Sequence, residues 1–137
     1  LVYATDGNFY GTTLHGGDWD DGTGFRLTPT GRLSTVYSFC SVKFCPDGVW
    51  PFGGLIQGAN GNLFGTTEAG GTHFQGSIFE ISTTGKLTTL YNFCSETKCA
   101  DGSAPQATLV QSTNGNLYGT TSLGGSNNAG TLVQFTP

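Results

Sequence analysis

The chain has 137 residues and a formal net charge of −4, and charged side chains make up only 10% of it. This length suits one domain with a core of useful size. The five Lys and Arg residues are scattered, which argues against nucleic acid as a partner because phosphate binding needs clustered positive charge. No apolar run in the sequence reaches the roughly 18 residues that a membrane span requires.

The polarity of the chain comes from 23 glycines and from Thr, Ser and Asn, and methionine is absent. This profile is typical of an all-β, turn-rich extracellular protein. The first residues, LVYATDGN, contain neither a basic segment nor an apolar signal core. We therefore expect an export signal and any anchor to lie outside this stretch, and we expect the protein to be secreted or displayed at the cell surface.

One glycine-rich string occurs three times, as DGNFYGTTLHGG from residue 6, NGNLFGTTEAGG from residue 60 and NGNLYGTTSLGG from residue 114. Glycines, prolines and cysteines around it recur at the same interval of 54 residues. A fixed period of this length indicates a tandem array of one structural unit. The chain divides into repeat 1 at 1–54, repeat 2 at 55–108 and a partial repeat 3 at 109–137.

Within repeat 2, short segments rich in β-branched and aromatic residues alternate with turn signals. Residues 55–59 are followed by Asn60-Gly61, a dipeptide suited to the positive φ angles of a two-residue hairpin turn. Further strands are predicted at 62–67, 77–82 and 86–93, and no stretch has the 3.6-residue period of a helix. Each repeat is therefore predicted to be a four-stranded antiparallel meander.

Four strands in a unit of this length are typical of a β-propeller blade. A closed ring of about seven such blades needs roughly 380 residues, so one chain does not close a ring. Residues 131–137 are expected to form a third strand with no outer neighbour. Further repeats of the same protein, or other copies of the chain, can complete this edge by strand addition. Copies that meet head to tail form a ring or a filament.

The four cysteines form two pairs, Cys40 with Cys45 and Cys94 with Cys99, one pair in each complete repeat. An even count at a repeated spacing in a low-charge, glycine-rich chain indicates disulfides and an oxidising compartment. Local pairing is favoured because each bond then belongs to one repeat. The alternative is a zinc site made of all four thiolates, which requires the two pairs to converge across blades.

The strings GNLFGTTEAGG and GSIFEISTTGKLTTLYNFC, with Pro105 shortly before NGNLYGTT, resemble the GloVer tandem repeat of bacterial surface proteins that use assorted C-terminal anchors. The resemblance covers essentially the whole chain. It implies export, surface display and a propeller-like array, and it implies no particular activity. Members of that family usually carry many more repeats than this chain.

The repeats differ most in the four residues after each Gly-Gly pair, which are DWDD, THFQ and SNNA. A uniform scaffold with variable loops on one face is a common way to build a binding surface. Aromatic rings among polar side chains suit sugar rings or a protein hot spot. The candidate ligand-binding residues are Asp18, Trp19, Asp20, Asp21, His73, Phe74, Gln75, Asn127 and Asn128. Phe44 and Trp50 are further aromatic candidates, and packing between blades explains those two equally well.

Other chemistry has less support in the sequence. The carboxylates of Asp18, Asp20 and Asp21 raise the possibility of a calcium site, but a solvated acidic loop is the simpler interpretation. The Gly-Thr-Thr strings lack the lysine and the following helix of a phosphate-binding loop. His15 and His73 stand at different positions of the repeat, and no nucleophile, base and acid recur together.

We therefore predict no enzyme activity, no cofactor and no metal. Asp47 and Asp101, each before a glycine, are assigned to simple turns. The favoured interpretation is an extracellular structural or adhesion module that assembles through its incomplete last blade. The alternative is a lectin-like module that binds carbohydrate with the variable loops.

Overall fold

The computed structural model describes all residues from 1 to 137, and they form three antiparallel sheets that we call blades 1, 2 and 3. Blade 1 contains β1 (Val2–Tyr3), β2 (Phe9–Thr13), β3 (Thr23–Leu27) and β4 (Leu33–Ser38). Blade 2 contains β5 (Ile56–Gln57), β6 (Leu63–Thr67), β7 (Ser77–Ile81) and β8 (Leu87–Asn92). Blade 3 contains β10 (Val110–Gln111), β11 (Leu117–Leu123) and β12 (Leu132–Phe135), with β9 (Ser103–Pro105) beside β11. The predicted all-β fold with unclosed propeller-type blades is confirmed.

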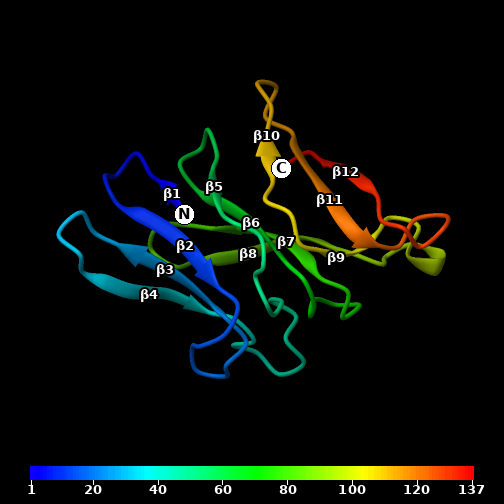
Figure 1. Ribbon diagram of the computed structural model, residues 1–137, viewed down its shortest axis with the longest axis horizontal. Coiled ribbons are helices and arrows are strands. Elements are labelled where there is room, and N and C mark those ends of the chain that lie inside the picture. Colours follow the sequence, from blue (N-terminus) through cyan, green and yellow to red (C-terminus); the bar gives the residue numbers. More distant parts are fainter.

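The blades stand side by side like an open fan, and the first strand of each lies at the inner side of the fan (Figure 1). Equivalent glutamine side chains join these inner segments. The Thr5 backbone N–H donates to Gln57 Oε1 at 2.9 Å, and the Ala59 N–H donates to Gln111 Oε1 at 3.0 Å. The same contact therefore recurs one repeat further along the chain.

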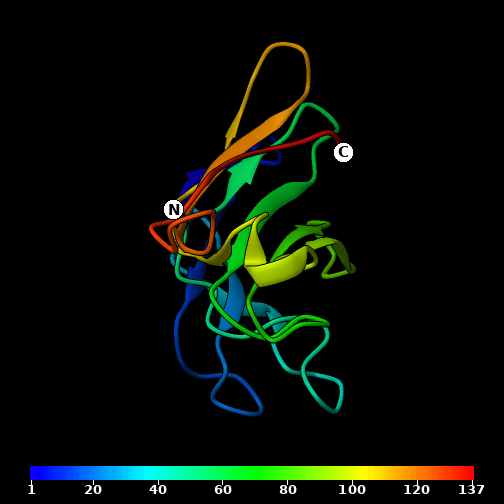
Figure 2. The ribbon, with the colours of Figure 1, turned by 90° about the vertical axis from the view of Figure 1, so that its right-hand side faces the viewer.

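The hairpin turns and the longer loops lie at opposite ends of the blades. Figure 2 shows the hairpin at 112–116 (orange) at the top and the loops at 14–22 and 40–48 (blue to blue-green) at the bottom. The variable loop and the disulfide loop of blade 1 consequently project from one face, as the propeller geometry predicts, and the bond from the Gly71 N–H to Cys45 O joins the variable loop of blade 2 to them.

The turn at Asn60-Gly61 is not the two-residue turn that the dipeptide predicts. The Gly58 N–H donates to Asn62 O at 2.8 Å, and the Gly61 N–H donates to Gly58 O at 2.9 Å. Only Gly61 has a positive φ, of 82°, and Asn60 does not. This pattern is a three-residue loop in which a type I turn is followed by one left-handed residue. Ser82–Lys86 repeats it, with Gly85 at φ 95°.

Blade 3 differs from the others at its outer edge. Its sheet includes β9, the crossing segment, which pairs with β11 through Pro105 opposite Thr121 and Ser103 opposite Leu123. The outer neighbour that β8 provides for β7 is missing beside β12. The predicted third strand without an outer partner is therefore observed.

The cores lie between blades, because each sheet is apolar on the faces that meet its neighbours. We call the contact between blades 1 and 2 the closed seam, which buries Ala4, Tyr10, Phe39, Leu55, Leu63, Phe79 and Ile81. The contact between blades 2 and 3 is the open seam, which buries Phe64, Ile78, Phe93, Leu109 and Leu117. Gly65 permits close packing at the closed seam, since a Cβ there would lie 2.6 Å from the Phe79 ring and 2.8 Å from Leu55.

The structure has a single short 3₁₀ helix, Thr97–Cys99, inside the second disulfide loop. No helix in it is long and apolar enough to span a membrane.

Candidate functional site

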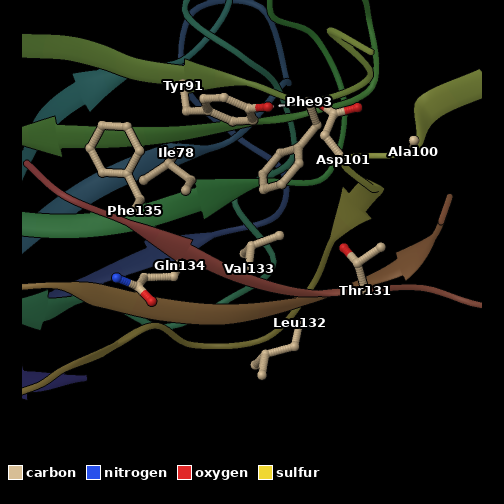
Figure 3. Close-up of a pocket in the computed structure, with 10 residues that line it drawn as sticks. All are labelled: Ile78, Tyr91, Phe93, Ala100, Asp101, Thr131, Leu132, Val133, Gln134 and Phe135. Atoms are coloured by element: carbon tan, nitrogen blue, oxygen red, sulfur yellow. Dashed lines mark hydrogen bonds between the residues drawn. The ribbon is translucent and has the colours of Figure 1, made fainter. Parts of the chain in front are cut away.

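A groove of about 270 Å³ runs along the open seam, between the outer strands of blade 2 and strand β12 (Figure 3). Its floor is apolar: Ile78 and Phe93 are each only 1% exposed. Val133 and Phe135 of β12 point towards this floor, whereas Leu132 points to the other side of the strand (Figure 3). The ring of Tyr91 packs edge-on against Phe93, with centroids 5.3 Å apart, and lies 6.2 Å from the ring of Phe135.

The equivalent space at the closed seam is covered by strand β8. Leu87 of β8 packs against the buried cluster there. The Thr89 hydroxyl donates to the carbonyl oxygen of Pro46 in the preceding blade at 3.5 Å. The groove at the open seam is therefore the place that a fourth strand occupies elsewhere in the same molecule.

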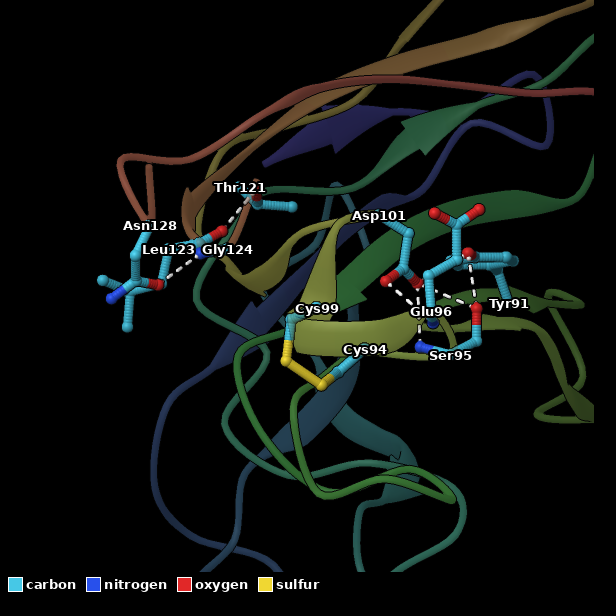
Figure 4. The surroundings of a disulfide bond; sticks show 10 residues. All are labelled: Tyr91, Cys94, Ser95, Glu96, Cys99, Asp101, Thr121, Leu123, Gly124 and Asn128. Carbon is cyan, nitrogen blue, oxygen red and sulfur yellow. Dashed lines mark hydrogen bonds between the residues drawn. A yellow bond between two sulfur atoms is a disulfide. The ribbon is translucent and has the colours of Figure 1, made fainter. Parts of the chain in front are cut away.

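Both cysteine pairs are joined locally, Cys40 to Cys45 and Cys94 to Cys99, as predicted. Figure 4 shows the second of these bonds. No free cysteine is left, so four thiolates are not available to a zinc ion, and the zinc alternative is wrong. Each bond closes the loop that leads from the last strand of one blade to the next blade.

Each disulfide loop also contains a polar hydrogen-bond network that the sequence interpretation missed. Asp101 Oδ2 accepts hydrogen bonds from the Tyr91 hydroxyl at 2.7 Å and from the Ser95 N–H and hydroxyl at 2.9 Å each (Figure 4). Asp47 accepts the equivalent bonds from Tyr37 and Ser41. These aspartates therefore organise the loop, and the assignment to a simple Asp-Gly turn was incomplete.

The network shifts the pKa values of its members. Burial by itself raises the pKa of Asp101, but the hydrogen bonds from Tyr91 and Ser95 outweigh it and hold the pKa below its ordinary 3.8. Burial is the largest cause that raises the pKa of Tyr37 to about 12, and Asp47 adds to it. Both shifts favour the ionised aspartate and the neutral tyrosine that the hydrogen bonds require.

Each disulfide loop is hydrogen-bonded to the glycine pair of the next blade. The carbonyl oxygen of Cys45 accepts from the Gly71 N–H at 2.9 Å, and that of Cys99 accepts from the Gly125 N–H at 2.9 Å. Gly71 and Gly125 both have positive φ, 76° and 75°, which suits glycine. The N–H of Gly17, the equivalent in blade 1, has no hydrogen-bond partner in the chain.

The predicted ligand-binding residues lie on the variable loops, and most are exposed. Trp19 is 65% exposed and Phe74 is 59% exposed, while Asp21 and Gln75 are half-buried. Two of the set close their own loops: Asp20 Oδ1 accepts from the Gly16 N–H at 2.8 Å, and Asn128 Oδ1 accepts from the Gly124 N–H at 2.9 Å. Ligand binding by these residues, including His73 and Asn127, stays a prediction.

The three neighbouring carboxylates are not gathered around one point. Asp21 lies close to Cys40 and Cys45, but Asp18, Asp20 and Asp21 do not bring their oxygens together within ligand distance of a common ion. Their geometry gives no support to the calcium interpretation.

Bulky aromatic residues on this face adopt an unfavourable backbone conformation. Phe44, Trp50 and Phe74 have φ values of 69°, 55° and 60°, in the left-handed region where large side chains are rare. The residues equivalent to Phe74 are Asp20 and Asn128, which tolerate that region better. Phe44 is 68% exposed and Trp50 is 40% exposed, so neither packs deeply between blades.

The three antiparallel sheets and the two seams between them define a tandem array of β-propeller-type blades that does not close on itself. The Gloeobacter/Verrucomicrobia repeat family matches the chain over residues 1–137, and the chain belongs to this family. This confirms the resemblance drawn from the repeated strings. No curated protein matches the chain.

Proposed function

We propose that the chain is a non-enzymatic structural or adhesion module that works outside the cell and joins further blades through its incomplete last blade. Two disulfides support an oxidising compartment, since such bonds persist mainly in secreted and surface proteins. Membership in a repeat family supports a modular role. The partners are other copies of the chain or further repeats of the same protein.

The open seam is the observation that carries this proposal. Strand β12 has a free edge, and the groove beside it is lined by apolar side chains that a fourth strand covers at the closed seam. A free edge next to an apolar groove is a template for pairing with another strand.

The outer face of blade 1 supports assembly as well. Leu1 and Leu33 are 77% and 65% exposed there, and Phe9, Phe25 and Leu27 are half-buried. The residues one repeat later are those that blade 2 turns toward blade 1 at the closed seam. An exposed apolar sheet face of this kind marks an interaction surface.

Identical copies have no spare strand to exchange. The chain contains two fourth strands, β4 and β8, and both are already paired in their own blades. Copies must therefore meet through blade faces, with Val110 and Leu132 of one blade 3 (64% and 76% exposed) against Leu1 and Leu33 of the next blade 1. Such a head-to-tail contact gives a ring or a filament, depending on whether it closes.

Sedimentation velocity under non-reducing conditions tests the assembly of copies. We expect species larger than the monomer as the concentration rises, and we expect Leu33→Asp to abolish them. Val42→Asp is the matched control, because Val42 is 55% exposed in a disulfide loop and away from this face. A monomer at every concentration for the unchanged chain would contradict the assembly of copies.

Carbohydrate binding by the variable loops is the second candidate, and the left-handed backbone at exposed aromatic residues favours it. Strained backbone at an exposed side chain is often retained for function. A glycan array tests it with Trp19→Ala and with Phe74→Asn, since asparagine suits the backbone at that position. Phe52→Ala is the control, because Phe52 is 57% exposed outside these loops. If the unchanged chain binds no glycan on a broad array, the lectin interpretation is contradicted.

A further inference from the structure

We propose that the groove beside β12 is a binding site for an extended polypeptide segment with the fourth-strand pattern of this repeat. That pattern is LSTVYS in β4 and LTTLYN in β8. This inference rests on the proposed function and deepens it, because it names the chemistry of the partner at the open edge. The segment would bind by strand addition, with backbone hydrogen bonds for affinity and side-chain pockets for specificity.

The two complete blades show how such a strand is placed. In blade 2, Leu87 stands opposite Ile81 and Thr89 stands opposite Phe79, and a bulge then brings Tyr91 opposite Ile78. Blade 1 has the same arrangement, with Leu33 opposite Leu27 and Thr35 opposite Phe25. The register is therefore a property of the repeat and not of one blade.

The same register can be transferred to β12 because its residues follow β7 by one repeat. An incoming leucine falls opposite Phe135, and an incoming threonine two residues later falls opposite Val133. At the closed seam the half-buried Leu87 packs against the core, which includes Phe79 and Ile81. The incoming leucine would thus cover the half-buried Val133 and Phe135 side chains that now face the groove.

A polar contact adds specificity for threonine. Thr89 donates its hydroxyl to the carbonyl oxygen of Pro46 across the closed seam. Ala100 holds the position of Pro46 at the open seam and lines the groove. An incoming threonine therefore has an equivalent acceptor, and valine, which has the same shape, cannot make this contact.

The occupant is a fourth strand of another blade of this repeat rather than an arbitrary apolar peptide. The apolar positions, the threonine and the tyrosine recur in β4 and β8, and each of these strands forms the outer edge of its own blade. Since both β4 and β8 are paired in their own blades, the segment comes from a further repeat of the same protein outside residues 1–137.

A synthetic peptide tests the proposal directly. The peptide KLTTLYNF, residues 86–93 with blocked ends, is labelled and titrated with the oxidised chain, and fluorescence anisotropy follows binding. We expect saturable one-to-one binding. Leu87→Asp in the peptide should weaken it at least tenfold, because the groove would receive a charge. Thr88→Asp is the matched control: Thr88 is exposed in blade 2, so that peptide should bind within a factor of about two.

Two variants of the chain locate the site. Val133→Asp should remove peptide binding, while Gln134→Asp should leave it within a factor of about two, because the exposed Gln134 side chain lies on the other side of β12 from Val133 (Figure 3). A chain extended after Pro137 by a second copy of residues 84–93 avoids the risk that Val133→Asp fails to fold. That chain should no longer bind the peptide and should melt several degrees higher, because the added strand buries apolar surface that the groove now exposes.

The outcomes separate this proposal from the assembly of copies. If the chain binds the peptide but sediments as a monomer, the peptide-binding site in the groove is supported and the assembly of copies is contradicted. Equal binding of the Leu87→Asp peptide, or an extended chain that melts no higher and still binds the peptide, would overturn the proposed site. Loss of binding only in the extended chain and in Val133→Asp supports it.

Discussion

The closed seam and the open seam are built from the same repeat positions, yet they are packed to different degrees. At the closed seam Phe79 and Ile81 are 1% and 2% exposed. Their equivalents at the open seam, Val133 and Phe135, are only half-buried beside a groove. The difference is the presence of β8 over one seam and of no strand over the other. A blade of this type is thus completed by its fourth strand, which seals the contact with the blade before it.

The largest expected effect is a difference in core truncation between the seams. Ile81→Ala should lower the free energy of unfolding by about 3–4 kcal/mol, because a fully buried side chain is lost. Phe135→Ala should cost only about 1–2 kcal/mol although the side chain is larger, since it is already partly in water. Urea denaturation followed by tryptophan fluorescence measures both. Equal losses would show that the groove is not open in solution.

Loss of a disulfide is the next largest expected effect. Replacing either cysteine pair by serine should cost about 2 kcal/mol, because both bonds close loops of the same length. The variants are Cys40→Ser with Cys45→Ser, and Cys94→Ser with Cys99→Ser, measured by the same denaturation. A clearly larger loss for the first pair would show that the loop at the closed seam is coupled to the packing around it.

Tyr37 and Tyr91 compare the polar networks at the two seams. Tyr37→Phe should cost about 1–2 kcal/mol at pH 7, because Asp47 is 7% exposed and loses a hydrogen bond. Tyr91→Phe should cost less, since Asp101 is half-buried and its Oδ1 also accepts from the Glu96 N–H, whereas Asp47 Oδ1 has no hydrogen-bond partner.

The pH dependence of stability tests the polar network at the closed seam in a second way. The pKa of Tyr37 is about 12 in the folded chain and about 10 in an unfolded one, so the neutral side chain favours folding. This contribution is complete below pH 10 and is lost as the pH rises towards 12. Thermal denaturation between pH 8 and pH 11 should therefore show a decline in stability that Tyr37→Phe reduces. An unchanged decline in that variant would contradict the shifted pKa.

Much of the fold follows from the sequence because the period fixes it. Strand segments such as 62–67 and 77–82 lie within a residue or two of β6 and β7, since short segments rich in β-branched and aromatic residues between turn signals leave few other structures. The turn at Asn60-Gly61 was predicted wrongly because that dipeptide serves both two-residue and three-residue loops, and only the register of the flanking strands decides between them.

The polar networks and the groove were not predicted from the sequence, for a different reason. Tyr91, Ser95 and Asp101 meet only when the disulfide folds the loop back on itself, so spacing alone does not bring them together. Their recurrence at Tyr37, Ser41 and Asp47 was nevertheless a readable signal. The missing fourth strand was predicted, whereas the apolar groove that it leaves depends on how two blades pack.

The smallest expected effect compares the variable loops of blades 2 and 3. Phe74 and Asn128 occupy equivalent left-handed positions, with φ of 60° and 52°. Asn128 also accepts a hydrogen bond from the Gly124 N–H, and asparagine at position 74 has the Gly70 N–H in the same place. Phe74→Asn should therefore stabilise the chain by about 0.5–1 kcal/mol, and Asn128→Phe should destabilise it by a similar amount. Differential scanning calorimetry of both variants gives the sign. If Phe74→Asn stabilises the chain, an exposed aromatic ring is kept at a cost in stability, which points to a contact that this ring makes. If Phe74→Asn destabilises the chain, Phe74 packs within its own loop. That result would remove the main support for the carbohydrate interpretation.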